Sequence, residues 1–152
     1  MAPTRERLLQ TAGAFIDSVN EWTPESVVRH FSPNFTFRTA PAKVKMVPQS
    51  QAECVAFVGL IGRITRTFQL QLVSGEDPLV DEVSRKVVMH LKSHSETTVG
   101  LYQNEYIWVV TLSPDGSEVD DVLNFADSQY ANEWVPKMVA AAKAVAQEAA
   151  DS

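Results

Sequence analysis

The sequence predicts a single α+β domain in which helices are separated from an antiparallel sheet. Apolar residues recur at helical spacing in the first third of the chain, and apolar and polar residues alternate from Phe68 onwards. Turn-forming residues divide the alternating part into strands, and a helical segment, residues 128–150, closes the chain. Helices grouped apart from a meander of strands are typical of α+β proteins. A length of 152 residues suits one domain with its own core, and we expect it to span residues 1–152.

Two helices are expected at the start of the chain. Residues 4–21 should form the first, capped by Thr4, because an apolar stripe follows the helical period. The stripe consists of Leu8, Leu9, Ala12, Phe15, Ile16 and Val19. The sequence Thr23-Pro24-Glu25 marks a second, short helix that should end near Phe31, since Thr caps helices and Pro suits their first turn. The segment 32–34, Ser-Pro-Asn, should then break that helix.

A strand and a third helix follow. Residues 35–39 alternate between apolar and polar side chains, which predicts a strand. A loop rich in Pro and Lys covers residues 40–49. Ser50 and Glu53 have the spacing of a capping box, in which each side chain accepts from the other's backbone N–H. A helix should therefore begin here and end near Arg66.

The second half of the chain should form a meander of strands. The predicted strands are residues 68–72, 86–98, 102–112 and 119–125. Clusters of Gly, Pro and Asp at 75–78 and 113–116, and Gly100, separate them, because these residues favour turns. The last strand leads directly into the final helix.

The composition excludes several classes of protein. Hydrophobic residues make up 45% and charged residues 21% of the chain, which is the balance of a globular domain. The net charge of −6 disfavours nucleic-acid binding, which needs a basic face. Cys54 is the only cysteine, so no disulfide can form within the chain. The N-terminus shows no apolar signal core, and no apolar run reaches the roughly 20 residues of a membrane helix. We therefore expect a cytoplasmic protein with no membrane partner.

Three segments carry a resemblance to a known group of proteins. They are FSPNFTFRTAP at 31–41, VVMHLKSHSETTVGLYQNEYIWVVTL at 87–112 and DGSEVDDVLNFADSQY at 115–130. The chain resembles the SnoaL-like polyketide cyclase group of the nuclear transport factor 2-like superfamily, especially the small proteins of fungal secondary-metabolite pathways. The resemblance implies a cone, in which a curved antiparallel sheet packs against three helices from the N-terminal half, with a C-terminal helix. It also implies a homodimer formed through the outer face of the sheet.

The resemblance also implies a range of activities. The group includes cyclases, isomerases, dehydratases, epoxide hydrolases and non-catalytic binding proteins, and fold alone does not choose among them. A cofactor-free isomerase or cyclase of a polycyclic polyketide or meroterpenoid intermediate is the expectation we adopt. The sequence departs from the group at Asn124, where a glutamate is common. If that glutamate acts as a base in relatives, another residue must take this role here or the role must be absent.

Three residues are candidates for catalysis. A carboxylate at a pocket wall has a raised pKa that suits proton abstraction, so Asp127 could be the base, although it also directly precedes a helix and can cap it. Imidazole exchanges protons near neutrality, which makes His90 a candidate. Strand alternation, however, places His90 outward or in a dimer interface if Met89 and Leu91 face the core. Arg38 could stabilise an enolate at the cavity mouth or form a surface ion pair.

Five residues are candidates for contact with the substrate. Asn104 and Tyr106 share one face of their strand, and the sequence does not say whether that face lines the cavity or packs in the core. Asn124 must be hydrogen-bonded if it is buried, and the substrate is one possible partner. Trp22 and Phe31 lie near the ends of predicted elements, which favours them as lid residues.

The sequence is also compatible with other activities. The same fold can hold a ligand, or form only a dimer surface, without turnover. A dehydratase with two histidines around one substrate atom fits poorly, because His90 and His94 lie about 13 Å apart along one strand. Cys54 reads as structural, since no clear histidine partner exists. No phosphate-binding loop and no cluster with metal-ligand spacing occurs, so we expect no metal and no cofactor.

Overall fold

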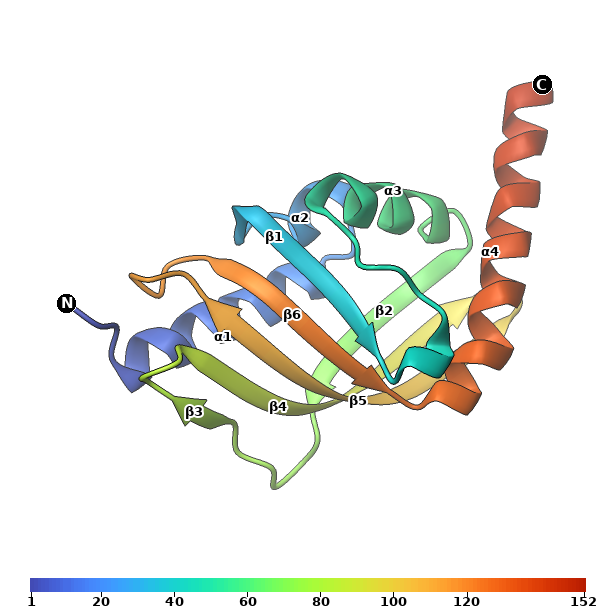
Figure 1. Cartoon of the computed structure of the whole chain (residues 1–152). Helices are drawn as coiled ribbons and strands as arrows, with labels where there is room; N and C mark the ends of the chain where they lie inside the picture. The colour runs from blue at the N-terminus through green and yellow to red at the C-terminus, as the bar shows by residue number, and fades with distance from the viewer.

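The computed structural model describes all residues, 1–152, as four helices around one six-stranded sheet (Figure 1). The helices are α1 (Arg5–Asn20), α2 (Pro24–Val27), α3 (Gln51–Ile61) and α4 (Ser128–Asp151), with a short 3-10 turn η1 (Ala42–Val44). The strands are β1 (Phe31–Ala40), β2 (Thr65–Leu72), β3 (Leu79–Asp81), β4 (Lys86–Thr97), β5 (Gly100–Leu112) and β6 (Val119–Ala126). The predicted α+β class is confirmed.

The sheet is mixed rather than wholly antiparallel. Its strand order is β1-β6-β5-β4-β2, and β3 pairs with β4 off this path. The β4–β5 and β5–β6 hairpins form the expected meander, and β2 and β3 are antiparallel to β4. β1, however, runs parallel to β6 at the edge of the sheet. No hairpin joins these two strands, so no tight turn imposes an antiparallel direction on them.

The N-caps expected from the sequence are present at all four helices. The side chains of Thr4, Thr23, Ser50 and Asp127 accept hydrogen bonds from the first-turn backbone N–H groups at 3.2, 3.0, 3.4 and 3.2 Å respectively. These bonds satisfy N–H groups that the helix itself leaves without a partner. The reciprocal capping box expected at Ser50 and Glu53 is only half formed, because the Glu53 carboxylate accepts from the Ser50 hydroxyl at 3.3 Å rather than from its backbone N–H. The complete box occurs at α2, where Ser26 completes it.

Several boundaries differ from those expected. α2 ends at Val27 rather than near Phe31, and β1 begins at Phe31 rather than at residue 35. The segment Ser-Pro-Asn at 32–34 interrupts the register between Phe31 and Thr36 as a bulge instead of separating the elements. α3 ends at Ile61, and β2 begins earlier than expected, at Thr65. β3 was not predicted, because its three residues are too few to show a clear alternation.

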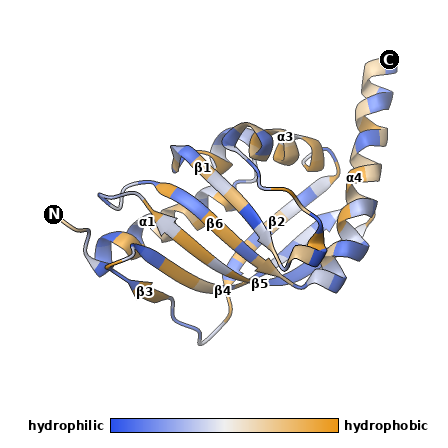
Figure 2. Cartoon of the chain, in the orientation of Figure 1, coloured by the Kyte–Doolittle hydropathy of each residue, from blue (hydrophilic) through white to orange (hydrophobic).

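One face of the sheet is covered by helices, and the other is bare. Along β4 the alternate residues from Val87 to Thr97 are buried, whereas those between them, His90 among them, are more exposed. Along β5 the inner set is Tyr102, Asn104, Tyr106, Trp108, Val110 and Leu112, each at least as buried as its neighbours on the strand. The helices α1, α2 and α3 cover this inner face, and the main core lies between them and the sheet. Figure 2 shows the hydrophobic residues along these strands.

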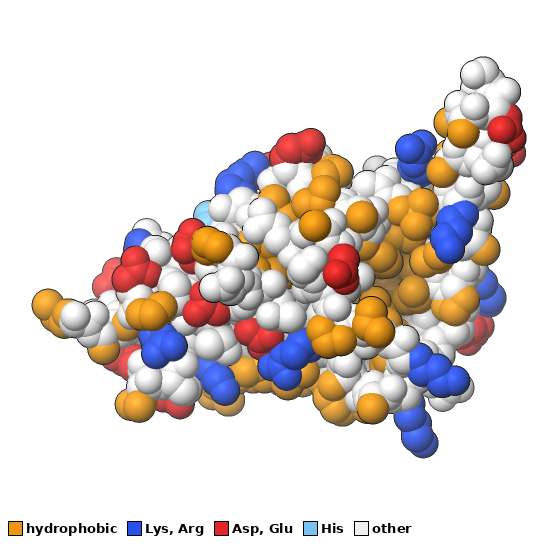
Figure 3. Space-filling view, turned by 45° about the horizontal axis from the view of Figure 1, so that its top comes forward, with side chains coloured by type: hydrophobic (Ala, Val, Ile, Leu, Met, Phe, Trp, Pro, Cys, Tyr) orange, Lys and Arg blue, Asp and Glu red, His pale blue; other side chains and the backbone are white.

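α4 covers the open end of the cone with its first half only. Met138 and Ala142 are buried against Ile61 and Ile64. Beyond Ala142 the helix projects from the body (Figures 1 and 3), and its residues there are exposed or, at Ala146, half-buried. None of the helices combines the length and the apolar character needed to cross a membrane.

Candidate functional site

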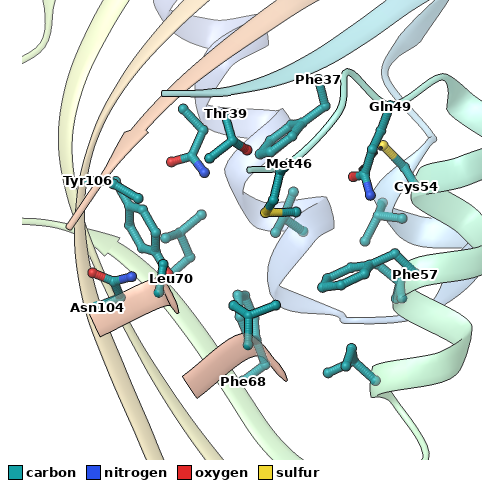
Figure 4. Close-up of a pocket in the computed structure, with 18 of the residues that line it drawn as sticks. Phe37, Thr39, Met46, Gln49, Cys54, Phe57, Phe68, Leu70, Asn104 and Tyr106 are labelled. Atoms are coloured by element: carbon teal, nitrogen blue, oxygen red, sulfur yellow. Dashed lines mark hydrogen bonds between the residues drawn. The ribbon is translucent and has the colours of Figure 1, made fainter. Parts of the chain in front are cut away.

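A cavity of about 190 Å³ lies between the inner face of the sheet and the helices. Of the 26 residues that line it, 21 are hydrophobic. In Figure 4, Asn104 and Tyr106 of the sheet face Cys54 and Phe57 of α3 across this space. Figure 3 shows a recess with hydrophobic side chains beside α4. A largely apolar hollow with a few polar groups is the usual form of a small-molecule site.

β5 supplies more polar groups to the cavity than any other element. Tyr102, Asn104, Tyr106 and Trp108 all line the cavity, so the polar-aromatic face of this strand is the inner one. Asn104 Nδ2 donates to the Tyr102 hydroxyl at 3.0 Å, and its Oδ1 accepts from the backbone N–H of Glu105 at 2.7 Å. The Asn104 amide thus has protein partners for both of its ends.

The neighbouring strand β6 adds one amide to this wall. Asn124 is buried, lines the cavity and accepts a hydrogen bond at Oδ1 from the indole Nε1 of Trp108 at 2.9 Å. The two residues are direct partners across β5 and β6. Trp108 meets, at the oxygen end of the amide, the expectation that a buried Asn124 must be hydrogen-bonded.

Trp22 and Phe31, both expected near the cavity, lie in its lining. Trp22 stacks on Phe68 with 3.9 Å between ring centroids, and its indole Nε1 is buried without a hydrogen-bond partner. Phe31 stacks on Phe35 with the centroids 3.4 Å apart. Phe68 lies on β2, Phe31 and Phe35 lie on β1, and Trp22 lies between α1 and α2, so these pairs bring the two edge strands and the helical layer together around the site.

Several lining residues were missed from the sequence. They include Phe37, Thr39, Met46, Gln49, Cys54 and Phe57. Alternation with Phe35 was a usable signal for Phe37 and Thr39, since β1 turns these side chains inward. Met46 and Gln49 lie in the loop before α3, where no periodic signal exists; the loop is positioned by backbone bonds of 2.8 Å in both directions between Gln49 and Phe37.

Arg38 does not line the cavity. Its side chain is half-exposed and forms a two-pronged ion pair with Asp121, with Nε–Oδ1 and Nη2–Oδ2 distances of 2.9 and 2.7 Å. Because Phe37 and Thr39 turn inward, the strand period turns Arg38 outward. The placement corresponds to the surface ion pair weighed as the alternative.

His90 also lies on the outer face of the sheet. Its Nε2 is 3.2 Å from Oε1 of Glu105. Glu105 is two positions away from Ile107, the residue that pairs with His90 across β4 and β5. Met89 and Leu91 are buried in the core, so alternation excludes His90 from the cavity. His94 is on the same outer face, where it contacts Gln103 at 3.1 Å. The structure therefore does not bring either histidine to the cavity.

Asp127 is exposed and lies just outside the cavity lining. Its Oδ1 accepts from the backbone N–H of Tyr130, which is the helix cap expected as the alternative role. The pKa of Tyr102 is raised chiefly by burial, and the charge of Asp127 makes a smaller contribution in the same direction. Asp127 is thus near the polar wall, but its side chain is occupied by α4.

No aspartate, glutamate, histidine, lysine or arginine lines the cavity. Its titratable groups are Cys54, Tyr102 and Tyr106. Burial raises the pKa of the Cys54 thiol to about 11, with a smaller contribution from the charge of Glu53. Burial likewise raises the pKa of Tyr102, and raises that of Tyr106 well above 10. All three groups are therefore neutral and protonated near pH 7, and the site offers hydrogen-bond donors rather than a charged base.

The sequence comparisons identify relatives over nearly the whole chain. No family model matches the sequence. Austinoid biosynthesis clusters protein H of Penicillium brasilianum is 36% identical over 141 residues, which cover 92% of this chain and 96% of that protein. The crystal structure of BvnE pinacolase from Penicillium brevicompactum is 36% identical, covers 91% of this chain and 98% of its own, and superposes with a TM-score of 0.85.

The chain belongs to the same family as austinoid biosynthesis clusters protein H and BvnE pinacolase, and its fold is SnoaL-like. AusH from Aspergillus nidulans, 33% identical with a TM-score of 0.78, covers 83% of this SnoaL-like chain and 87% of its own. A putative SnoaL-like polyketide cyclase from Shewanella denitrificans, only 12% identical with a TM-score of 0.68, shares the fold. The resemblance expected from the sequence is confirmed. This SnoaL-like domain contains no group of three or more His, Cys, Asp or Glu side chains that could hold a metal ion.

Proposed function

We propose that this protein is a cofactor-free isomerase or cyclase of a polycyclic polyketide or meroterpenoid intermediate in secondary-metabolite biosynthesis. The observation that carries the proposal is the cavity itself, which is apolar over most of its wall and polar along β5 and β6. Such a site holds a hydrophobic ring system and directs its oxygen atoms to one side. The relatives named for austinoid biosynthesis and as a pinacolase support this class of substrate and reaction.

Hydrogen-bond donation is the chemistry that the polar wall supports. The neutral phenols of Tyr102 and Tyr106 and the amide of Asn124 can donate to an oxygen atom on which negative charge develops. Donors fixed in a water-poor cavity stabilise such a charge more than water does, because they need no reorganisation. We assign Tyr106 as the main donor, since it lines the cavity and its hydroxyl is held 2.9 Å from Ser93 Oγ.

A rearrangement suits this wall better than enolisation. Enolisation needs a base to remove a proton from carbon, and no carboxylate or imidazole lines the cavity. A pinacol-type shift of an epoxy alcohol conserves mass, because the epoxide C–O bond breaks as a carbon group migrates, the carbinol becomes a ketone, and its proton passes to the epoxide oxygen. This shift, like a ring closure onto a carbonyl, requires that the substrate be folded and its oxygen polarised. The catalytic roles expected for Asp127, His90 and Arg38 would need these side chains to act from outside the cavity lining.

The proposal is tested with the intermediate that accumulates when the gene is deleted from its host. The purified protein is dialysed against a chelator and incubated with this intermediate without any added cofactor. We expect a product of the same mass and a different retention time, because isomerisation and cyclisation of this type conserve mass. A product that has lost water, or conversion only after a cofactor is added, would contradict the proposal.

A non-catalytic binding protein is the second candidate. The lack of any charged acid or base in the cavity favours it, since a carrier needs only shape and a few polar contacts. The same incubation separates the two candidates. If the intermediate binds in a 1:1 ratio and is recovered unchanged after a long incubation with excess protein, the protein is a carrier.

We further propose a homodimer that buries the outer face of the sheet. Ile107 and Phe125 are partners across β5 and β6, and both are exposed on this face, Phe125 by 52%. The substitution Phe125→Glu should shift the protein from dimer to monomer in size-exclusion chromatography with light scattering. Val47→Glu, at an apolar residue in the exposed loop before α3, is the control that should leave the dimer intact. A wild-type monomer at micromolar concentration would contradict the dimer.

A further inference from the structure

The bond between Trp108 and Asn124 determines which end of the Asn124 amide faces the cavity. An indole N–H can only donate, so the amide atom 2.9 Å from Trp108 Nε1 must be the oxygen. The opposite end, Nδ2, which carries two N–H donors, is therefore turned away from Trp108. It makes no hydrogen bond within the protein.

The Asn124 donor is not sealed inside the protein. The side-chain nitrogen and oxygen atoms that are buried without a partner are Trp22 Nε1 and Ser32 Oγ, so Asn124 Nδ2 retains accessible surface. Asn124 as a whole is buried and lines the cavity, so this surface opens into the cavity. An unused donor in an apolar wall is a place for an acceptor atom of a ligand.

A hydroxyl lies beside this donor in the next strand. Thr39 is the register partner of Asn124 across β1 and β6, as Trp108 is across β5 and β6. Trp108, Asn124 and Thr39 thus form one row across three strands, and all three line the cavity. Thr39 stands on the same wall as Phe37 in Figure 4, and its hydroxyl has no partner in the protein.

We infer that Asn124 binds a carbonyl-type oxygen of an uncharged ligand and that Trp108 is the positioning residue that fixes the Asn124 amide for this contact. The inference rests on the proposed function and names the substrate class of that site. Trp108 prevents the amide from turning over, because the reversed amide would place two N–H groups against each other. The free end of Asn124 therefore only donates, which suits an acceptor oxygen such as a ketone or lactone carbonyl, and the Thr39 hydroxyl can donate to a second lone pair of the same oxygen.

The ligand at this row must be uncharged. No lysine, arginine or histidine lines the cavity to compensate a carboxylate or phosphate, and no acidic residue lines it to compensate an amine. An isolated charge in such surroundings is strongly disfavoured. A neutral carbonyl, in contrast, needs only the one or two hydrogen bonds that the row offers.

The inference is tested with a matched pair of probes, 2-adamantanone and 2-methyleneadamantane. The two molecules have the same cage, and only the ketone can accept a hydrogen bond. Binding is measured by titration calorimetry or by the fluorescence of the cavity tryptophans. We expect the wild-type protein to prefer the ketone by about 3- to 10-fold, the contribution of one neutral hydrogen bond, and the carbonyl stretch of the bound ketone to shift to lower frequency.

Substitutions at Asn124 separate this contact from general packing. Asn124→Leu should abolish the ketone preference and leave the binding of the methylene compound within about twofold. Asn124→Asp keeps an acceptor for Trp108 and replaces only the donor end. Its ketone preference should therefore persist at low pH, where the new carboxyl group carries a proton, and disappear as that group ionises, whereas the wild-type preference should not change with pH.

The double variant Trp108→Phe/Asn124→Leu covers the case in which a lone indole N–H prevents folding, since both partners of the bond are removed. It should bind both probes equally. Equal binding of the two probes by the wild-type protein, failure to bind the ketone, or an unchanged preference in Asn124→Leu would overturn the inference. None of these measurements involves turnover. A protein that selects the ketone but does not convert the intermediate would contradict the proposed function and leave the inference standing.

Discussion

The hydroxyl oxygens of Tyr106 and Ser93 lie 2.9 Å apart on the inner face of β4 and β5. Ser93 Oγ also accepts from the backbone N–H of Asn104 at 3.3 Å, which holds the serine in place. The serine hydroxyl can therefore donate to the tyrosine oxygen, and the tyrosine proton is then free to point into the cavity. Of the two directions open to this bond, donation by Ser93 is the one that leaves the Tyr106 proton for a ligand, as the donor role proposed for Tyr106 requires.

Tyr106→Phe should lower turnover about 10- to 100-fold, because it removes one donor to a developing charge. Ser93→Ala should have a smaller effect, since the phenol remains but loses its orientation. Both rates are measured by product formation from the accumulated intermediate, with ligand affinity measured in parallel. If Tyr106→Phe converts the intermediate at the wild-type rate, the donor role proposed for Tyr106 is wrong.

The protein should lose stability above about pH 10 as a result of its buried phenols. The pKa values of Tyr106 and Tyr102 are raised in the folded state, chiefly by burial, so these groups keep their protons while the unfolded chain ionises. The unfolded state then binds fewer protons, and the free energy of unfolding falls by about 1.4 kcal/mol per pH unit for each such group. Urea titrations from pH 8 to 11 measure the slope. The double variant Tyr102→Phe/Tyr106→Phe should show a flatter slope; an identical slope would contradict the assignment.

Asp127→Asn and Asp127→Ala separate helix capping from acid–base chemistry. Asparagine caps a helix about as well as aspartate, whereas alanine should lower the free energy of unfolding by about 1 kcal/mol. If the Asp127 side chain only holds α4 through its bond to Tyr130, the asparagine variant should keep both stability and turnover. Loss of turnover in the stable asparagine variant would instead establish the carboxylate as a participant in the reaction.

His90→Ala and Arg38→Ala should leave turnover within about twofold, because both side chains lie outside the cavity lining. Arg38→Ala breaks an exposed ion pair with Asp121, so its effect on stability should be no more than about 1 kcal/mol and should shrink in salt. Single-turnover assays beside thermal melts in low and high salt check both points. A decrease of 100-fold in either variant would restore an acid–base or enolate-binding role for that residue.

Much of the fold was predictable because its signals are local. The N-caps Thr4, Thr23, Ser50 and Asp127 act within four residues of the chain, so the sequence reports them directly. The parallel pairing of β1 with β6 is different, since its partners lie 85 to 88 residues apart and no turn links them. The resemblance to known relatives, rather than any local rule, supplied the cone.

The site was less predictable than the fold. Alternation groups Asn104 with Tyr106, but it does not say which group faces the helices; that choice depends on how β4 and β5 pack. Met89 and Leu91 carried the usable hint, because their burial places His90 outside. The bond between Trp108 and Asn124 joins residues 16 positions apart and depends on the hairpin register, which sequence pattern does not fix.

The charge-free lining of the cavity has a consequence for how a ligand arrives. The protein carries a net charge of −6, and that field repels anions and attracts cations without acting on a neutral molecule. Capture of a neutral ring system should therefore proceed at the same rate in dilute buffer and in concentrated salt, apart from the salting-out of the ligand itself. A proposed ligand of this kind should enter by partition from water, and an ionised precursor should remain outside.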